Sequence, residues 1–278
     1  MTIQSLKALT TRSRPAEGRA PGSEEKDILP VRLEITPAEG IVALVQGSTP
    51  AGSVLTVTCL PHQGVGATVR TAIELAYLGF EVVPHLAARS IESRQQLLGL
   101  VHNFHDAGIS EVFVVGGDAG ETAGPYASSL PLLEDLADLS GGRIGAGVAG
   151  YPEGHPGHSE LHMLDALLEK QHLASSVVTQ LCFSAARVRW YAETLRREGV
   201  RLPVWAGVAG AVPRAQLISV VTRIGVGPSL KLLSRRGPLG RRLVTGGQYS
   251  PQAMLAELRD SGAVDGVHLC TFNNVTGV

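Results

Sequence analysis

The chain has 278 residues, of which 44% are hydrophobic, and its formal net charge at pH 7 is −1. This length suffices for one large α/β domain or two small ones, and either buries a substantial core. Such a balanced charge creates no global field that would attract nucleic acid or a membrane surface. The three cysteines are too few and too scattered for a disulfide framework or a zinc ribbon. We therefore expect a cytoplasmic protein that binds neither nucleic acid nor membranes.

The segment before the first apolar run, from Met1 to Lys26, is polar and rich in Arg, Ser, Pro and Gly. It lacks the apolar core that a signal peptide requires. We predict a flexible tail over residues 1–28. No stretch of the chain approaches the roughly 20 apolar residues that a membrane span needs. The sequence leaves the oligomeric state open, and an oligomer is compatible with it.

From residue 29 onward, short apolar runs alternate with amphipathic segments. The runs predict strands near residues 31–36, 54–58, 81–85, 111–116, 143–149, 176–181, 203–208 and 265–271. The amphipathic segments have apolar residues at helical spacings of three and four, as in Ile91–Ala107, Leu130–Leu139, Ser159–His172, Ser184–Glu198, Arg214–Ile224 and Pro251–Ser261.

This alternation predicts a single-domain α/β fold over residues 29–278, with eight strand–helix units arranged as a (β/α)8 TIM barrel. A doubly wound sheet is the alternative, and it is favoured only if two of the runs are misread. The least regular part, Gly225–Gly247, contains several arginines between Arg235 and Arg242. We interpret it as a solvated excursion before the last strand, with the alternative that its arginines hold an anionic ligand tail.

Several apolar runs end in polar side chains. Asp118 follows Val114-Val115-Gly116-Gly117, and three other runs end at Glu34, His85 and Gln180. Ligands of parallel barrels bind at the carboxyl ends of the strands. In a barrel, one bowl would therefore collect Glu34, Thr58, His85, Asp118, Tyr151, Gln180 and Asn273.

Three of these side chains have competing interpretations. A carboxylate in a partly apolar bowl has a raised pKa, so we expect Glu34 to act as a general acid, with an ion pair to Arg32 or another surface base as the alternative. Asp118 follows two glycines that let a flat ring approach the backbone, but it is alternatively a helix N-cap. The amide of Gln180 can bind a heterocycle edge or make a structural hydrogen bond.

The segment from Gly150 to Pro156 presents Tyr151, Glu153 and His155 on a stiff loop suited to planar and phosphate-bearing ligands. With His158 and His162 it also has a spacing that suggests a metal site. We reject that interpretation because Pro156 and Gly157 oppose helical convergence of the imidazoles on one ion, and we expect no metal.

These residues resemble the methylenetetrahydrofolate reductases, flavoprotein (β/α)8 barrels that reduce 5,10-methylenetetrahydrofolate to 5-methyltetrahydrofolate with a nicotinamide donor. The resemblance runs from about Val31 to Asn273 and rests on Leu33-Glu34-Ile35-Thr36-Pro37, Gly117-Asp118, Tyr151-Pro152-Glu153 and Thr179-Gln180. It implies Glu34 and Asp118 as catalytic residues, Glu34 being the acid that assists opening of the folate ring. The implied substrate-binding residues are Gln180, Gln216 and Asn273. The implied FAD-binding residues are Thr58, His85, Gly117, Asp118, Tyr126, Ala127, Tyr151, His155 and Lys170.

The chain also departs from the family pattern. Gly116 stands where the family usually has Arg, Lys170 is the one basic residue near the helix position that holds the cofactor diphosphate, and Val220 replaces a covering aromatic. These departures imply weaker FAD binding. The alternatives are direct hydride transfer from NADH or NADPH without flavin, oxidation of 5-methyltetrahydrofolate as the physiological direction, and a non-catalytic barrel that binds folate or flavin. Retention of Glu34 argues against the last, because binding alone needs no proton donor there.

Overall fold

The structure is a computed structural model that describes residues 29–117, 120–155, 157–213, 217 and 248–277. The predicted tail over residues 1–28 and the irregular segment Gly225–Gly247 lie outside the described residues. So do Asp118 and Gln216, and, apart from Leu217, the helix predicted over Arg214–Ile224. The predictions made for them stay untested.

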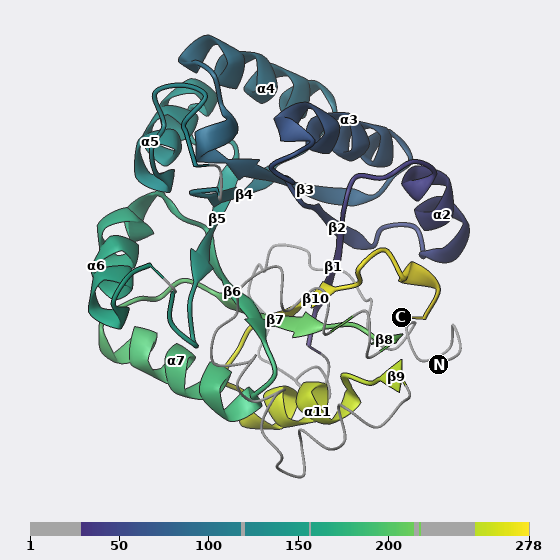
Figure 1. Ribbon diagram of the computed structural model, residues 1–278, viewed down its shortest axis with the longest axis vertical. Coiled ribbons are helices and arrows are strands. Elements are labelled where there is room, and N and C mark those ends of the chain that lie inside the picture. Colours follow the sequence, from purple (N-terminus) through teal and green to yellow (C-terminus); the bar gives the residue numbers. More distant parts are fainter. Residues whose placement is uncertain (1–28, 118–119, 156, 214–216, 218–247, 278) are drawn as a thin grey trace, which may run out of the picture.

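In the described part of the chain, eight parallel strands close into a barrel in the order β1-β10-β7-β6-β5-β4-β3-β2 (Figure 1). The strands are β1 (Val31–Ile35), β2 (Val54–Val57), β3 (Glu81–Ala87), β4 (Glu111–Val115), β5 (Gly145–Gly150), β6 (Ser176–Cys182), β7 (Val204–Ala209) and β10 (Gly266–Cys270). Each coincides with one of the predicted apolar runs. The predicted (β/α)8 barrel is therefore confirmed, and the doubly wound alternative is wrong.

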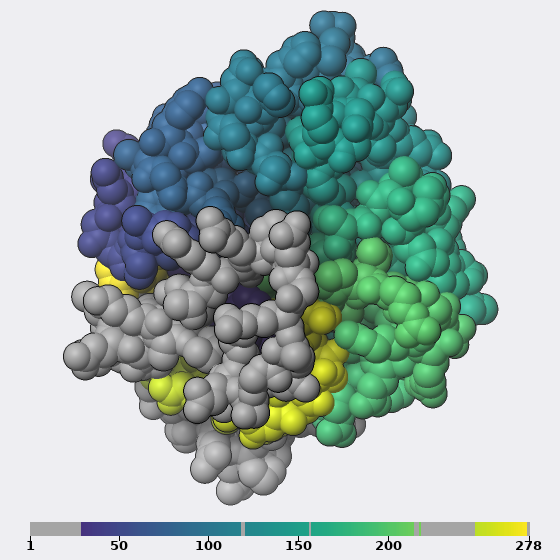
Figure 2. Space-filling view, turned by 180° about the vertical axis from the view of Figure 1, so that it is seen from behind, coloured from purple at the N-terminus to yellow at the C-terminus, as the bar shows by residue number. Residues whose placement is uncertain are grey.

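Helices surround the barrel, and along the chain they alternate with its strands. They are α2 (Ile41–Ser48), α3 (Gly64–Tyr77), α4 (Arg94–Asp106), α5 (Ser129–Ser140), α6 (Glu160–Lys170), α7 (Ala185–Arg197) and α11 (Gln252–Ser261). Short 3-10 turns cover η2 (Ala88–Ser90), η3 (Gln171–Leu173) and η4 (Val275–Gly277), and a small antiparallel pair joins β8 (Val212–Pro213) to β9 (Gln248–Tyr249). Figure 2, seen from the opposite side, shows the same order around the rim as a continuous run of colours.

Serine caps explain where three of the predicted helices begin. Ser93, Ser159 and Ser184 each accept a hydrogen bond from the backbone N–H three residues later, at the starts of α4, α6 and α7. A cap of this kind satisfies a helix donor that has no partner within the helix. The predicted segment Ile91–Ala107 accordingly becomes helical at Arg94, after the cap, and not at Ile91.

The barrel interior is crossed by an ion pair near the amino ends of the strands. Arg32 on β1 donates from Nη1 and Nη2 to the two carboxylate oxygens of Glu111 on β4, at 2.8 and 2.9 Å. Because β2 and β3 separate these strands in the sheet, the bond spans the interior. The Arg32 guanidinium also lies 3.9 Å from the ring centre of Trp205 on β7. Side chains therefore fill this end of the barrel, as is usual for the fold.

Among the described residues, no helix combines the length and the apolar character required to cross a membrane.

Candidate active site

Glu34, near the carboxyl end of β1, forms a hydrogen-bonded pair with His268 of the adjacent strand β10. Glu34 Oε2 and His268 Nε2 are 2.8 Å apart. The His268 side chain is 4% exposed, whereas that of Glu34 is 21% exposed. The carboxylate is therefore accessible to a ligand, whereas the imidazole is buried from solvent. The alternative pairing of Glu34 with Arg32 is wrong, since Arg32 binds Glu111.

The electrostatic surroundings of Glu34 correct the expectation of a raised pKa. Burial does raise the pKa, but the hydrogen bond from His268 and the charges of His268 and His85 outweigh it and lower the pKa to about 2. A neighbouring cation and a hydrogen bond to the charged form both favour the carboxylate. Near neutral pH the side chain of Glu34 is therefore ionised in the ligand-free protein.

His85 on β3 lies in the barrel interior with this pair. Its ring centre is 4.8 Å from that of Phe113 and 5.9 Å from that of His268. Burial lowers the pKa of His85 to about 4, so the imidazole is neutral near pH 7. Its Nε2 is buried without a hydrogen-bond partner in the described structure. His85 does not belong to the residues that line the large cavity described below, where the sequence placed it beside a flavin.

Cys270 completes a cluster with this pair, because it is the strand partner of Glu34 in the β1–β10 register. Ligand atoms of Glu34, His268 and Cys270 lie within 4.8 Å of one another. Two ligands bound to one zinc ion at a tetrahedral angle would be about 3.3 Å apart. The 2.8 Å contact between Glu34 and His268 is shorter, and it has the length of a hydrogen bond. We therefore interpret the cluster as a hydrogen-bonded pair beside a thiol.

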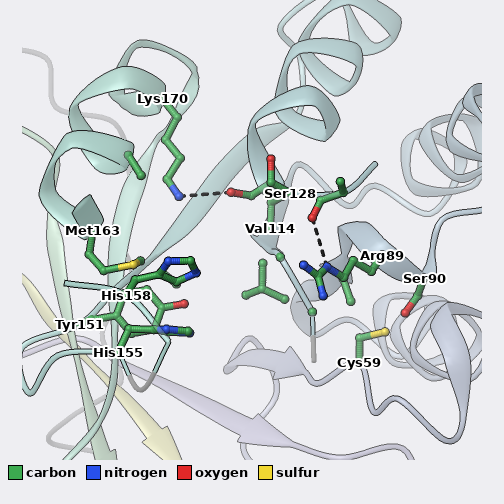
Figure 3. Close-up of a pocket in the computed structure, with 18 of the residues that line it drawn as sticks. Cys59, Arg89, Ser90, Val114, Ser128, Tyr151, His155, His158, Met163 and Lys170 are labelled. Atoms are coloured by element: carbon green, nitrogen blue, oxygen red, sulfur yellow. Dashed lines mark hydrogen bonds between the residues drawn. The ribbon is translucent and has the colours of Figure 1, made fainter. Parts of the chain in front are cut away.

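A cavity of about 630 Å³ opens over the ends of β3, β4 and β5, between α5 and α6. Five predicted site residues line it: Gly117, Ala127, Tyr151, His155 and Lys170. In Figure 3, Tyr151, His155, His158 and Met163 form one wall, and Arg89, Ser90 and Cys59 lie across from them. The volume is within the range of about 300–1,000 Å³ that is usual for small-molecule and cofactor sites.

The upper rim of the cavity offers groups suited to an anion. The Lys170 ammonium donates to Ser129 Oγ at 3.2 Å, and Ser128 and Ser129 begin helix α5 (Figure 3). The amino end of a helix carries free N–H groups and a partial positive charge, which favour phosphate. Burial lowers the pKa of Lys170, although the charge of Glu169 opposes this shift. Opposite, Arg89 Nε donates to the carbonyl of Ala127 at 3.1 Å.

Two histidines of the loop that follows Tyr151 and one in the first turn of α6 lie in a row along the cavity. The ring centres of His155 and His158 are 4.9 Å apart, and those of His158 and His162 are 4.8 Å apart. Tyr151 meets His155 edge to face at 5.1 Å. This arrangement presents aromatic edges and faces to a ligand. Gly117, with a φ of +91°, allows the backbone turn on the facing side of the cavity.

Gln180 owes its position to an irregularity in the sheet. The register between β6 and β7 shifts between Val178 and Leu181, so Thr179 and Gln180 form a bulge. Thr179 Oγ1 accepts a hydrogen bond from the N–H of Gly207 at 2.8 Å. A Cβ atom at Gly207 would lie 2.5 Å from the carbonyl oxygen of Thr179, so only glycine permits this approach. Bulges commonly re-aim side chains at active sites, and Gln180 Nε2 is buried without a partner in the described structure.

Three other predicted residues are engaged in internal contacts. Tyr126 is 2% exposed, and its hydroxyl donates to Asp135 Oδ2 at 2.7 Å. Thr58 donates through its hydroxyl to the carbonyl of Ile35 at 3.2 Å. Asn273 accepts from the Thr36 N–H at 2.8 Å and donates to the Thr36 carbonyl at 3.1 Å. The predicted ligand contacts of these residues stay predictions.

Sequence reasoning overlooked His268, which stands two positions before Cys270 in the last strand. A polar residue inside an otherwise apolar run was the available signal, because alternate strand residues share one face. It also assigned no site role to Arg89 or Ser129, whose neighbours in space come from separate strand–helix units.

Two solved structures share this fold but little sequence. A protein from Burkholderia cenocepacia J2315, named for a lyase/mutase activity, has a TM-score of 0.50 and 13% identity, with 88% of this chain and 77% of that chain covered. A GH18 chitinase from Pseudoalteromonas aurantia has a TM-score of 0.50 and 10% identity, with 87% of this chain and 94% of that chain covered. At these identities the similarity shows the barrel and nothing about the chemistry.

A sequence profile of the methylenetetrahydrofolate reductases matches residues 62–278. The match covers most of the barrel, including the strand ends that carry His85, the Tyr151 loop and the Thr179-Gln180 bulge. The chain belongs to the methylenetetrahydrofolate reductase family, whose members are folate-related oxidoreductases of one-carbon metabolism.

Proposed function

We propose that the protein interconverts 5,10-methylenetetrahydrofolate and 5-methyltetrahydrofolate, with NADH or NADPH as the hydride donor in the reducing direction. The observation that carries this proposal is the partly exposed carboxylate of Glu34 at the carboxyl end of the barrel, hydrogen-bonded to a buried imidazole. Opening the methylene bridge needs a proton at the departing nitrogen, and a carboxyl group is a suitable donor. A protein that only bound folate would have no use for this pair.

The reaction uses the residues as follows. A proton passes from the Glu34 carboxyl group to N10 of the folate while the bond between N10 and the bridging carbon breaks, leaving an iminium at N5. Hydride then adds to the bridging carbon and forms the methyl group. Gln180 is proposed to bind the pterin through its free amide N–H. Asp118, Gln216 and Asn273 complete the proposed folate contacts.

The cavity suits FAD in size and in the chemistry of its lining. Lys170, Ser128 and Ser129 would hold the diphosphate at the start of α5, and Tyr151 and His155 would lie along the rest of the molecule. Bound FAD would carry hydride between nicotinamide and folate. Because Gly116 lines the cavity where the family usually has Arg, we expect weaker binding than is usual for the family. Each charge-assisted hydrogen bond lost to a phosphate reduces affinity by about 1.5–3 kcal/mol.

Direct hydride transfer from the nicotinamide to the folate is the second candidate. The uncharged Gly116 favours it, since a cavity that has lost a phosphate-binding cation is less suited to a tightly held dinucleotide cofactor. The site by itself does not set the physiological direction, because both directions pass through one transition state.

The test is a visible absorption spectrum of the purified protein together with assays of folate-dependent NADH and NADPH oxidation, with and without added FAD. A partly yellow protein whose rate rises with FAD supports the flavin route. Full activity of colourless protein, unaffected by FAD, supports direct transfer. Lack of folate-dependent turnover in both directions, with both nicotinamides and with FAD present, would overturn the proposed function.

A further inference from the structure

We propose that His268 is a positioning residue that stores the proton delivered by Glu34, so that the two side chains act as one couple holding a single transferable proton. This inference rests on the proposed function. It answers a difficulty in that function, because a general acid must carry a proton whereas the Glu34 carboxyl group is ionised near neutral pH in the ligand-free protein. The adjacent imidazole can supply what the carboxylate lacks.

The geometry of the pair sets the direction in which a proton would move, from His268 to Glu34. His268 Nε2 contacts Glu34 Oε2 at 2.8 Å. The imidazole is buried in the barrel, whereas the carboxylate is partly exposed. His268 Nδ1 is buried without a partner, so among the described residues the imidazole makes its hydrogen bond to Glu34 alone. A proton on His268 therefore has a direct path to the bowl through Glu34. Imidazole is the side chain that binds and releases protons near neutral pH.

The other groups that face the pair do not compete with it for a proton near neutral pH. His85 on β3 is neutral near pH 7 because burial lowers its pKa. Cys270 on β10 stays a thiol because burial and the charge of Glu34 raise its pKa. Arg32 and Glu111, in the layer below, bind each other in a bidentate pair. Phe113 on β4 contributes an uncharged ring. Among the described neighbours, one carboxylate and one imidazole therefore share the exchangeable proton.

The proton balance is as follows. Before reaction, the couple exists as carboxylate with imidazolium and converts to carboxylic acid with neutral imidazole when the proton crosses the hydrogen bond. The acid O–H bond then breaks as an N–H bond forms at folate N10, and the electron pair of the N10–carbon bond stays on N10. The couple is left as carboxylate with neutral imidazole and regains one proton from water. The two electrons of the reduction come from the nicotinamide hydride.

The experiment compares wild type with His268→Gln by the pH dependence of kcat/KM for the folate. Glutamine retains an N–H that can donate to Glu34 but cannot ionise. The wild-type rate should fall as pH rises through the titration of the couple. In His268→Gln that fall should occur roughly 1–2 pH units lower, toward the range of a buried carboxyl group, so the rate near neutral pH drops about 10- to 100-fold. An unshifted profile in folded His268→Gln would overturn the proposal, because a purely structural hydrogen bond is preserved by glutamine.

His85→Gln is the matched control. It places the same substitution in the same part of the barrel, but His85 makes no hydrogen bond to Glu34 among the described contacts. Its profile should shift much less than that of His268→Gln, because His85 acts on Glu34 only through its charge and is neutral near pH 7. An equal shift in both variants would show that any change in the barrel interior moves the profile, and would count against the specific role of His268.

A second measurement does not depend on the folding of His268→Gln. Protein labelled with 15N-histidine is titrated by NMR as wild type and as Glu34→Gln. One imidazole should lose its proton at a lower pH in Glu34→Gln, because its carboxylate partner is gone. If all imidazoles titrate alike in the two proteins, the couple does not exist. Inactivity of the wild-type protein would instead reject the proposed function, while the NMR comparison would still report on the pair.

Discussion

Among the described residues, the barrel interior holds two pairs of a basic side chain and a carboxylate, one in each of two layers, and both pairs have a partner on β1. In the lower layer, the Arg32 guanidinium binds Glu111 through two hydrogen bonds and stacks on Trp205. In the upper layer, Glu34 binds His268 through one hydrogen bond, and the carboxylate is partly exposed. Arg32 and Glu34 are two residues apart on the same face of the strand, about 7 Å along it.

The difference between the pairs lies in the basic side chain, which is arginine in one and histidine in the other. Arginine keeps its proton at all accessible pH values and presents a planar fork that matches a carboxylate. The lower pair can therefore link β1 to β4 but cannot transfer a proton. Histidine can release its proton near neutral pH, so the upper pair can take part in acid catalysis. We propose that the same backbone arrangement serves stability at one end of the barrel and chemistry at the other.

The largest expected effect tests the upper pair. Glu34→Gln should slow folate reduction by roughly 10²–10⁴-fold, the usual contribution of general acid catalysis, while the protein stays folded and still binds folate. Steady-state rates and folate binding by calorimetry, measured on the same preparation, separate catalysis from binding. Wild-type turnover by Glu34→Gln would remove the chemical role of the upper pair and with it the contrast between the layers.

The lower pair should behave in the opposite way. Arg32→Met leaves Glu111 without its cation and should lower the free energy of unfolding by about 3 kcal/mol, with little change in kcat of the folded fraction. Urea titration followed by circular dichroism measures the effect. The double variant Arg32→Met/Glu111→Leu removes both charges and should recover part of the loss. A single variant as stable as wild type would show that the lower pair does not hold the barrel.

A third change leaves both pairs untouched and addresses the cavity. Lys170→Met removes the ammonium beside Ser129 and should weaken FAD binding by about 10- to 100-fold, the effect of one lost charge-assisted hydrogen bond. Flavin fluorescence titration gives the affinity, and Arg189→Met, at an exposed position of α7, serves as the control. Equal FAD affinity in Lys170→Met and wild type would place the diphosphate elsewhere.

The smallest expected effect is the pH dependence of stability. The pKa of Glu34 in the folded protein is about 2, below the ordinary value of 4.5, so its ionised form stabilises the fold above pH 4.5. That stabilisation is lost as the pH falls toward about 2. The difference in unfolding free energy between wild type and Glu34→Gln should therefore shrink over this interval. A difference that stays constant in urea titrations across the same pH range would show that Glu34 titrates alike in both states.

The sequence by itself determined the architecture and predicted candidate site residues at the carboxyl ends of the strands. Each barrel strand is a local apolar run, and the caps Ser93, Ser159 and Ser184 stand directly before their helices, so neighbouring residues carry enough information to predict them. Glu34 and Gly117 were predicted at strand ends because each stands at the end of such an apolar run. The family resemblance, which the profile match confirms, rested on short motifs of this kind.

Only the tertiary structure decided which side chains meet. Glu34 pairs with His268, 234 positions away, and not with Arg32, two positions away, because closure of the barrel sets β1 beside β10. This contact reverses the expected direction of the Glu34 pKa shift. In the same way, Asn273 binds Thr36 across 237 positions, and the bulge at Gln180 depends on Gly207 in the next strand. Periodicity reports which face of a strand a residue occupies, whereas barrel closure determines the partner it finds there.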